Sequence, residues 1–292
     1  MHIFVIGATG ALGRVLLPRL QQDQHKIHTL VRSAEQAKDL QARGVVASVG
    51  ELLSPEGQRQ LPELARDCEA VIHIATAIPA NPSLPGAWDT NTRLRTEGTR
   101  ALLAAALQAG ATRYIQQSIV MAYPDGGDRW LDEEQPLDTT PERTVVCAPV
   151  IEMERQVKAV APGRMHWTIL RGGLFVGAGT GQERLLENLR AGQVEIPGNG
   201  QNFVSLVHVA DVAEAFALAL ERAPVSSTYN IVDQPLRYGD YVTTLARKLN
   251  LPTPPYNSAL PEQSSFRCSN QLAKEQLGWQ PQHSLWPGEP GW

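Results

Sequence analysis

A glycine-rich turn near the start of the chain is the first stretch whose residue types and spacing could do chemistry. In VIGATGALGR, Gly7, Gly10 and Gly13 follow a β-rich run and open a helical pattern. Gly7 permits a tight turn, Gly10 lets the backbone approach a pyrophosphate, and Gly13 allows close packing of helix on strand. The helix then presents free N–H groups and a positive dipole end to phosphates. The alternative is a turn whose glycines serve packing alone. The predicted dinucleotide contacts are Gly7, Thr9, Gly10, Ala11, Leu12 and Gly13.

The end of the second predicted strand indicates which dinucleotide is bound. An acidic residue at this place would accept a hydrogen bond from the ribose 2′-hydroxyl of NAD. The sequence TLVRS instead has Val31 there, followed by Arg32 and Ser33. A guanidinium beside a hydroxyl suits a 2′-phosphate, so the sequence favours NADP(H) over NAD(H). The alternative is that Arg32 is a solvated loop residue.

These residues need a scaffold of alternating strands and helices. A long Ala/Leu-rich helix, TEGTRALLAAALQAG, is expected to end at Gly110, with Arg95 and Glu97 interpreted as a charged first turn. Continuous apolar strands alternating with helices predict a doubly wound parallel sheet of the Rossmann type, an α/β fold. The predicted strands lie at 2–6, 26–31, 44–49, 69–76, 112–119 and 166–171.

The pattern changes after Arg171, where glycines and prolines cluster and the segments become shorter. The segment 203–232 has a strand, a helix and another strand, which fits a return to the first sheet. We therefore predict a dinucleotide-binding Rossmann domain over 1–171, with 203–232 returning to it. Residues 172–202 and 233–292 are predicted to form a small interleaved α/β lobe that binds substrate.

The composition excludes several classes of protein. The 292 residues carry a formal net charge of −4, which gives no reason to expect nucleic acid or an anionic membrane as a partner. No apolar run approaches the roughly 20 residues that span a bilayer. The first strand starts directly after Met1, which leaves no room for a signal peptide, so we expect a cytoplasmic protein. The scattered Cys68, Cys147 and Cys268 predict reduced thiols, and the seven histidines show no metal-ligand spacing.

Several blocks of the sequence, taken together, resemble the extended short-chain dehydrogenase/reductase family, also called NAD-dependent epimerase/dehydratase-like proteins. The blocks are GATGALG, EAVIHIAT, LRGGLFVGAGT, VHVADVAEAFALALE, YNIVD and LGWQPQ, spread over essentially the whole chain. The resemblance implies an oxidoreductase or epimerase/dehydratase-like enzyme that acts on a small molecule. It also implies a homodimer formed through the helices near 96–109 and 148–161. The cofactor contacts that it adds are Glu51 and Leu52 near the adenine, and Ala75 and Thr76 along the ribose and pyrophosphate.

The catalytic pair that the resemblance implies is missing. In the family, a tyrosine phenol moves a proton, and a lysine four residues later lowers the pKa of that phenol and holds a ribose. In CAPVIEMER, Glu154 matches a glutamate that the family often carries, and this register places Cys147 and Ile151 at the two positions. None of the six tyrosines precedes a lysine by four residues. Isoleucine can neither lower a pKa nor bind a hydroxyl, so ordinary Tyr/Lys chemistry is not expected.

Two residues remain as catalytic candidates, Ser118 and Tyr123. The family's serine precedes a tyrosine by four residues, whereas Ser118 precedes Tyr123 by five and Ile119 holds the usual place. A difference of one residue in the loop would restore Ser118. Tyr123 is the best remaining phenol, and its alternative is a tyrosine that packs at the strand end. Cys147, with no cation nearby in sequence, is interpreted as a structural thiol.

Three hypotheses follow from a kept glycine turn and a lost Tyr/Lys pair. The first is an NADP(H)-dependent oxidoreductase or epimerase of a divergent subgroup with an altered proton relay. The second is a non-catalytic NADP(H)-binding sensor or regulatory protein. The third is a scaffold that has lost the cofactor, which the intact glycine turn disfavours.

Overall fold

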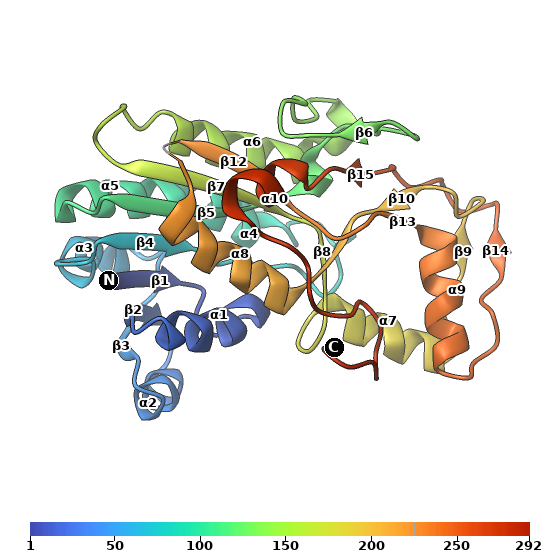
Figure 1. Ribbon diagram of the computed structural model, residues 1–292, viewed down its shortest axis with the longest axis horizontal. Helices are drawn as coiled ribbons and strands as arrows, with labels where there is room; N and C mark the ends of the chain where they lie inside the picture. Colours follow the sequence, from blue (N-terminus) through green and yellow to red (C-terminus); the bar gives the residue numbers. More distant parts are fainter. Residues whose placement is uncertain (225) are drawn as a thin grey trace. The chain divides into compact units, whose positions relative to one another are not determined.

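The central feature of the protein is a seven-stranded sheet, seen in a computed structural model that describes residues 1–224 and 226–292 (Figure 1). Its strand order is β12-β7-β5-β4-β1-β2-β3, and β1 pairs in parallel with both β2 and β4. The order reverses at β1 and β4, which is the doubly wound Rossmann arrangement, so the predicted fold class is confirmed. The strands are β1 (His2–Ile6), β2 (Lys26–Val31), β3 (Val46–Val49), β4 (Ala70–His73), β5 (Arg113–Ile119), β7 (His166–Gly172) and β12 (Ser227–Ile231).

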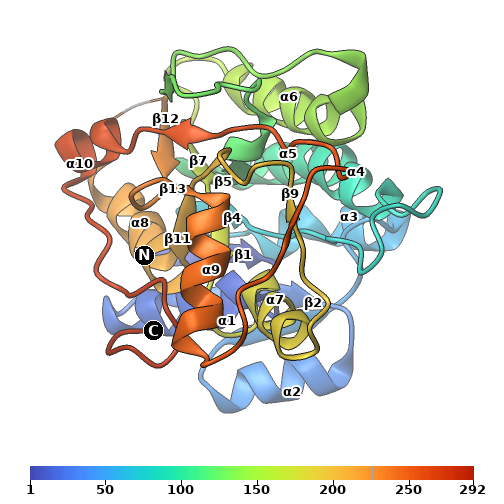
Figure 2. The ribbon, with the colours of Figure 1, turned by 90° about the vertical axis from the view of Figure 1, so that its right-hand side faces the viewer.

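Helices cover both faces of this sheet. Figures 1 and 2 show α5 and α6 on one side of the strands and α1 on the other. Phe4 and Val71 point from the sheet into an apolar cluster that also contains Leu102 of α5 and Val157 of α6. The helices are α1 (Ala11–Gln22), α2 (Ala34–Ala42), α3 (Pro55–Leu64), α4 (Asp89–Arg93), the π-helix η1 (Leu94–Gly98), α5 (Thr99–Ala109) and α6 (Thr144–Lys158).

Short sequence signals set the ends of these helices. The hydroxyl of Ser33 accepts a hydrogen bond from the backbone N–H of Gln36 and so caps α2. Gly110 ends α5 in the left-handed conformation, with φ of 75°, as expected from the sequence. The π-helix η1 leads into α5 without a break, because Gly98 and Thr99 both keep helical backbone angles.

The chain divides into two compact units. Unit 1 comprises 1–118, 139–170 and 216–228, and unit 2 comprises 119–138, 171–215 and 229–292. Short strand pairs build unit 2, namely β6 with β15, β8 with β11, β9 with β14 and β10 with β13. The remaining elements are η2 (Val120–Ala122), β6 (Trp130–Leu131), η3 (Pro141–Arg143), β8 (Leu174–Val176), α7 (Gly181–Arg190), β9 (Ile196–Pro197), β10 (Phe203–Val204), β11 (Leu206–His208), α8 (Val209–Arg222), β13 (Leu236–Arg237), α9 (Tyr238–Lys248), β14 (Tyr256–Asn257), β15 (Arg267–Cys268) and α10 (Gln271–Leu277).

These bounds differ from the predicted domain division, which placed 119–138 in the Rossmann domain. The segment belongs to unit 2 because β6 pairs with β15 and the backbone N–H of Gly126 donates to the carbonyl of Ser265. Of the returning segment 203–232, only 216–228 belongs to unit 1, since β11 pairs with β8. Residue 225 of that segment lies outside the described residues. The assignment of cofactor and substrate to the two domains stays a prediction.

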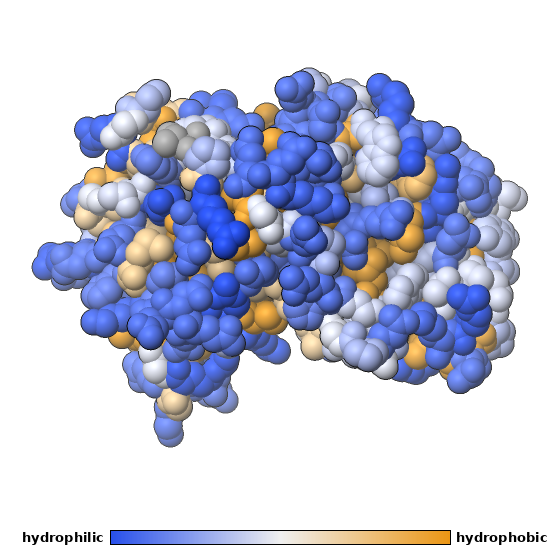
Figure 3. Space-filling view, viewed as in Figure 1, coloured by the Kyte–Doolittle hydropathy of each residue, from blue (hydrophilic) through white to orange (hydrophobic). Residues whose placement is uncertain are grey.

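The surface is largely polar on the face drawn in Figure 3, where apolar residues form only small patches. No helix among the described residues is both long and apolar enough to cross a bilayer. Cys68, Cys147 and Cys268 are all buried, and none of them forms a disulfide.

Candidate cofactor-binding and active site

The glycine turn after β1 packs directly on the residues that follow β4. Gly7 has φ of +106°, and a Cβ atom at this position would lie 2.7 Å from the backbone nitrogen of Ala75. A Cβ atom on Gly13 would lie 2.4 Å from the carbonyl oxygens of Gly7 and Ala8. At Gly10, by contrast, the nearest atom is 3.4 Å away and the residue is exposed. Packing therefore demands glycine at two positions, while the third leaves the backbone open to a ligand.

The first turn of α1 is suited to bind an anion. Its N-cap, Gly10, has no side chain to satisfy the free N–H groups, and the first turn contains no acidic residue. The side chain of Arg14 donates from Nε to the carbonyl of Thr9 at 3.1 Å, which braces the turn. Thr9 and Ala11 are half-buried, whereas Leu12 packs in the core. These residues fit the pyrophosphate of a dinucleotide.

Arg32 lies at the carboxyl end of β2, next to the strand that carries the glycine turn. Its backbone N–H donates to Oε1 of Gln36 at 3.1 Å, which fixes the backbone there. Its side chain is exposed, and no hydrogen bond or ion pair holds the guanidinium in the part of the chain that the structure describes. Ser33 keeps its hydroxyl proton available, because as a cap its oxygen only accepts. Both side chains can therefore meet a phosphate at this edge.

The other predicted cofactor contacts lie after β3 and β4. Glu51 is exposed, and its carbonyl accepts hydrogen bonds from the backbone and hydroxyl of Ser54. Leu52 is buried, with its side chain close to Gly98. Ala75 is half-buried against Gly7, and Thr76 is exposed. The structure thus brings Gly7 and Ala75 together, although they were predicted from separate motifs.

Helix α6 carries the two positions where the catalytic pair was expected. Cys147 is fully buried, and Ile151, one turn later, is partly exposed. Glu154 is buried and accepts hydrogen bonds from Ser118 Oγ at 2.7 Å and from Lys158 Nζ at 3.0 Å. The hydroxyl of Ser118 therefore joins β5 to α6 through a buried carboxylate. A catalytic role for Ser118 stays a prediction.

A buried polar cluster in unit 1 lies between β4, β5 and the η1–α5 helix. Nδ1 of His73 donates to Oε1 of Gln116 at 3.1 Å, and the Tyr114 hydroxyl donates to the same oxygen at 3.0 Å. Burial lowers the pKa of His73 to about 4 and raises that of Tyr114. Among the described residues, Nε2 of His73 has no hydrogen-bond partner. Sequence reasoning missed this cluster, since a single histidine in an apolar strand carries no spacing signal.

Arg95, interpreted from sequence as part of a charged first turn, is instead buried inside a continuous helix. Only 4% of the residue is exposed. Its Nη1 donates to the sulfur of Met153 on α6 at 3.7 Å. Arg95 lies four residues after the buried Asn91 and four before the buried Thr99, and the sequence alone does not mark any of the three as buried. That spacing puts all three on one helix face.

Tyr123 belongs to a buried hydrogen-bond network within unit 2. Its hydroxyl accepts from Arg171 Nη1 at 2.7 Å and donates to Asn230 Oδ1 at 2.9 Å. The side chain is fully buried, and this burial raises its pKa. Glu133 accepts from the backbone N–H of Asn230 at 2.7 Å, which ties the network to a carboxylate. A neutral, fully bonded phenol is what this arrangement holds, and a catalytic role for Tyr123 stays a prediction.

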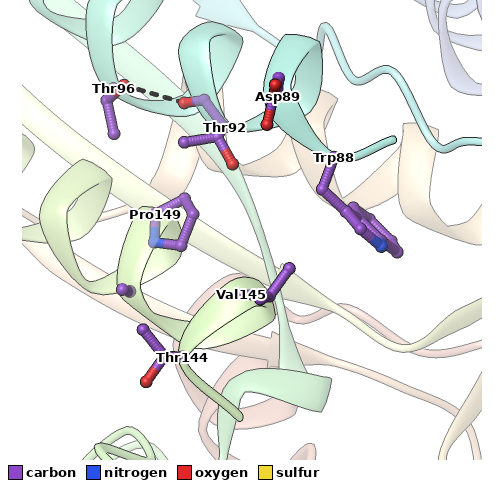
Figure 4. Close-up of a pocket in the computed structure, with 8 residues that line it drawn as sticks. Trp88, Asp89, Thr92, Thr96, Thr144, Val145 and Pro149 are labelled. Atoms are coloured by element: carbon purple, nitrogen blue, oxygen red, sulfur yellow. Dashed lines mark hydrogen bonds between the residues drawn. The ribbon is translucent and has the colours of Figure 1, made fainter. Parts of the chain in front are cut away.

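A shallow pocket of about 390 Å³ lies between the α4–η1 segment and the start of α6 (Figure 4). The hydroxyl of Thr96 points along the helix and donates to the carbonyl of Thr92 at 2.8 Å. The lining combines apolar and hydroxyl side chains and holds one carboxylate, so it offers no acid–base pair. Its residues are Trp88, Asp89, Thr92, Thr96, Thr144, Val145, Ala148 and Pro149. Within the described residues, no three metal-binding side chains gather at any place.

A Rossmann sheet with a glycine turn at the start of its first helix defines the class of protein. The model of the NAD dependent epimerase/dehydratase family matches residues 3–232, so the chain belongs to that family. Reductases are among the relatives that the chain matches.

Two relatives and one solved structure are similar to this chain. A 3-diazoavenalumate denitrifying reductase of a Streptomyces species is 32% identical over 308 residues, covering 98% of each chain. A 4-hydroxy-2-methyl-3-oxo-4-farnesyl-3,4-dihydroquinoline-1-oxide ketoreductase of Stigmatella aurantiaca is 30% identical over 253 residues, covering 84% of this chain and 72% of its own. The dTDP-glucose 4,6-dehydratase DesIV of Streptomyces venezuelae, solved with NAD and TYD bound, has a TM-score of 0.83. It is 19% identical, covers 97% of this chain and 93% of its own, and shows the fold alone.

Proposed function

We propose that the protein is an NADP(H)-dependent reductase of a small molecule whose reduction needs no proton from the enzyme. One observation carries the proposal. The turn that binds the dinucleotide has every glycine that it needs, whereas α6 has the buried thiol of Cys147 and the aliphatic Ile151 where a proton relay would stand. A site that can bind the dinucleotide but has no proton relay suits hydride transfer without acid–base catalysis.

The chemistry of the substrate follows from this requirement. The bound dinucleotide supplies a hydride. Reduction of a ketone to an alcohol also consumes a proton, which a Tyr/Lys pair ordinarily provides. A diazonium group consumes none, because R–N₂⁺ and hydride give R–H and N₂. The likeness over the full length to a denitrifying reductase of a diazo compound supports this substrate class.

The residues of the chain have separate tasks in this proposal. The N–H groups at the start of α1 bind the pyrophosphate, and Gly10 lets it approach. Arg32 and Ser33 bind the 2′-phosphate that distinguishes NADP(H) from NAD(H). The buried thiol of Cys147 is structural in this proposal, and the aliphatic Ile151 supplies no proton.

A homodimer is also part of the proposal, with the outer face of α5 and α6 as its interface. Besides the pocket at the start of α6, a second groove of about 420 Å³ runs between the ends of these helices. Val145 is 60% exposed on this face, and Ala104 and Ala148 are exposed small residues through which helices can approach closely. The lining residues of this second groove are Leu103, Leu107, Gln156, Ala159, Val160, Ala161 and Arg164. Sedimentation should give a dimer, and Val145→Arg should give a monomer.

The function is tested in two stages. Purified protein is titrated with NADPH and with NADH by calorimetry. The complex is then offered an aryl diazonium salt and, separately, a panel of ketones, while the nicotinamide absorbance is followed. NADPH consumption with release of N₂ supports the proposal. Tight NADPH binding without turnover of either class would favour the non-catalytic sensor, and no binding of either dinucleotide would sink both.

A further inference from the structure

The most unusual charge in unit 1 is the guanidinium of Arg95. It is 4% exposed and lies on the π-helix η1, which packs against α6. Burial lowers its pKa to about 10, which still leaves it charged at neutral pH. A charge taken out of water costs free energy unless it is paired and hydrogen-bonded. The partners of Arg95 therefore decide whether its role is structural.

Those partners do not neutralise it. Within residues 1–224 and 226–292, its hydrogen-bond partner is the neutral sulfur of Met153, and no carboxylate lies within ion-pair distance. Glu154 attracts it from further away, but its two oxygens accept from Ser118 and Lys158. His73, the other titratable neighbour, is neutral because its pKa is about 4. An apolar side chain would pack in this place at lower cost, so a structural role alone does not account for an arginine.

The position of Arg95 fits one end of a dinucleotide. The glycine turn after β1 places the pyrophosphate, and Arg32 at the end of β2 places the adenosine half on that side of it. The nicotinamide half must then extend in the other direction, over the carboxyl ends of β4 and β5. Arg95 lies at those ends, since it interacts electrostatically with His73, the last residue of β4, and with Glu154, which bonds Ser118 near the end of β5.

We propose that Arg95 replaces the lysine that is absent at Ile151 and holds the ribose hydroxyls on the nicotinamide side of the bound cofactor. The assignment rests on the proposed function. A guanidinium has five N–H donors, and Met153 engages one of its nitrogens, so others remain to bind hydroxyl oxygens. The cation reaches the site from η1 instead of α6, which explains why the lysine position on α6 can be aliphatic. A π-helical turn, which often marks a functional site, is what presents it.

The test removes the charge of Arg95, restores a charge at position 151, and measures the affinity for the cofactor. Arg95→Met removes the charge and keeps an unbranched apolar chain, and Arg93→Met is the matched control, because Arg93 is exposed and pairs with Glu97. Two ligands are titrated by calorimetry: NADPH, and 2′,5′-ADP, which lacks the nicotinamide ribose. Arg95→Met should weaken NADPH about tenfold, the loss of one charge-assisted contact, and leave 2′,5′-ADP unchanged. Adding Ile151→Lys to Arg95→Met should restore NADPH affinity.

Each outcome decides between two roles. Unchanged NADPH affinity in Arg95→Met, or an equal loss for both ligands, would overturn the assignment and make Arg95 structural. If Arg95→Met does not fold, Arg95→Lys keeps the charge, and the assignment requires it to retain most of the NADPH affinity while 2′,5′-ADP binds as before. Failure of the wild-type protein to bind NADPH would refute the proposed function itself, and the Arg95 assignment with it. Wild-type binding with an unaffected Arg95→Met would refute the assignment alone.

Discussion

The glycine turn after β1 and the helix α6 belong to the same compact unit, yet they keep very different amounts of their family's chemistry. The turn has all three glycines, and two of them are held by backbone contacts that no side chain could replace. Helix α6 has Glu154, and the predicted register places Cys147 and Ile151 where the sequence analysis expected a tyrosine and a lysine. Backbone geometry at a phosphate site tolerates little change. Under the proposed function, the substrate needs no proton relay on α6, and Arg95 supplies a cation from η1.

The largest expected effect tests whether the glycine turn requires glycine at position 13. Gly13→Ala forces a Cβ atom to within 2.4 Å of two carbonyl oxygens, so unfolding free energy should fall by about 3 kcal/mol, as for other overpacked sites. Urea unfolding measures the loss. Gly181→Ala is the control, because nothing lies within 4 Å of its Cβ position. A fully stable Gly13→Ala would break the claim that packing demands this glycine.

The second effect concerns the buried cluster under η1 and its pH dependence. The pKa of His73 is about 4 when folded, below its ordinary value of 6.5, so the unfolded chain binds more protons between these pH values. The free energy of unfolding should therefore be highest above pH 6.5. It should fall by about 3 kcal/mol, through His73 alone, as the pH decreases toward 4. Comparing unfolding of the wild type and His73→Gln across this range isolates the contribution. Parallel pH profiles for the two proteins would contradict it.

The third effect tests whether Ser118, which bonds Glu154 of α6, is structural or catalytic. Ser118→Ala removes the 2.7 Å hydrogen bond to buried Glu154 and should cost about 2 kcal/mol of unfolding free energy. If hydride transfer needs no proton from the enzyme, kcat on a diazonium substrate should stay the same. Thr144→Ala, which removes an exposed hydroxyl from α6, serves as the control. A large drop in kcat with unchanged stability would instead make Ser118 catalytic.

The smallest effect tests cofactor choice at the end of β2. Arg32→Ala should weaken NADPH by about tenfold and leave NADH unaffected, because only NADPH carries the 2′-phosphate. Calorimetric titration of both cofactors measures the difference. Arg43→Ala, an exposed arginine after α2, should change neither. An equal loss for NADH would refute the preference for NADP(H).

The predicted strands agree closely with the observed ones where local pattern is strong. The strands predicted at 2–6 and 26–31 are observed as His2–Ile6 and Lys26–Val31, and α5 ends at Gly110. The strand predicted at 69–76 is shorter, Ala70–His73, and the backbone of Ile74 and Ala75 that follows it packs on Gly7. Periodicity predicts where an apolar strand lies, but only a neighbouring segment decides where its pairing stops.

The candidate site divides in the same way. The glycine turn and the place of Arg32 at the end of β2 could be predicted because each depends on a few residues that are close in the chain. Their binding of a phosphate stays a prediction. The burial of Arg95 and the bonding of Ser118 to Glu154 depend on η1, β5 and α6, which the fold brings together from distant parts of the sequence. From sequence alone, a charged residue on a helix is interpreted as solvated, because the segment that packs on it is not known.

The sequence by itself therefore determined the Rossmann fold class, the glycine turn and the absence of any Tyr/Lys pair, because each depends on residue type and short spacing. Tertiary structure alone decided that Ser118 and Tyr123 are buried and bonded, that 119–138 joins unit 2, and that Arg95 is a buried cation beside α6. The physical reason is that burial and charge compensation are properties of surroundings, and those surroundings come from residues far apart in the chain.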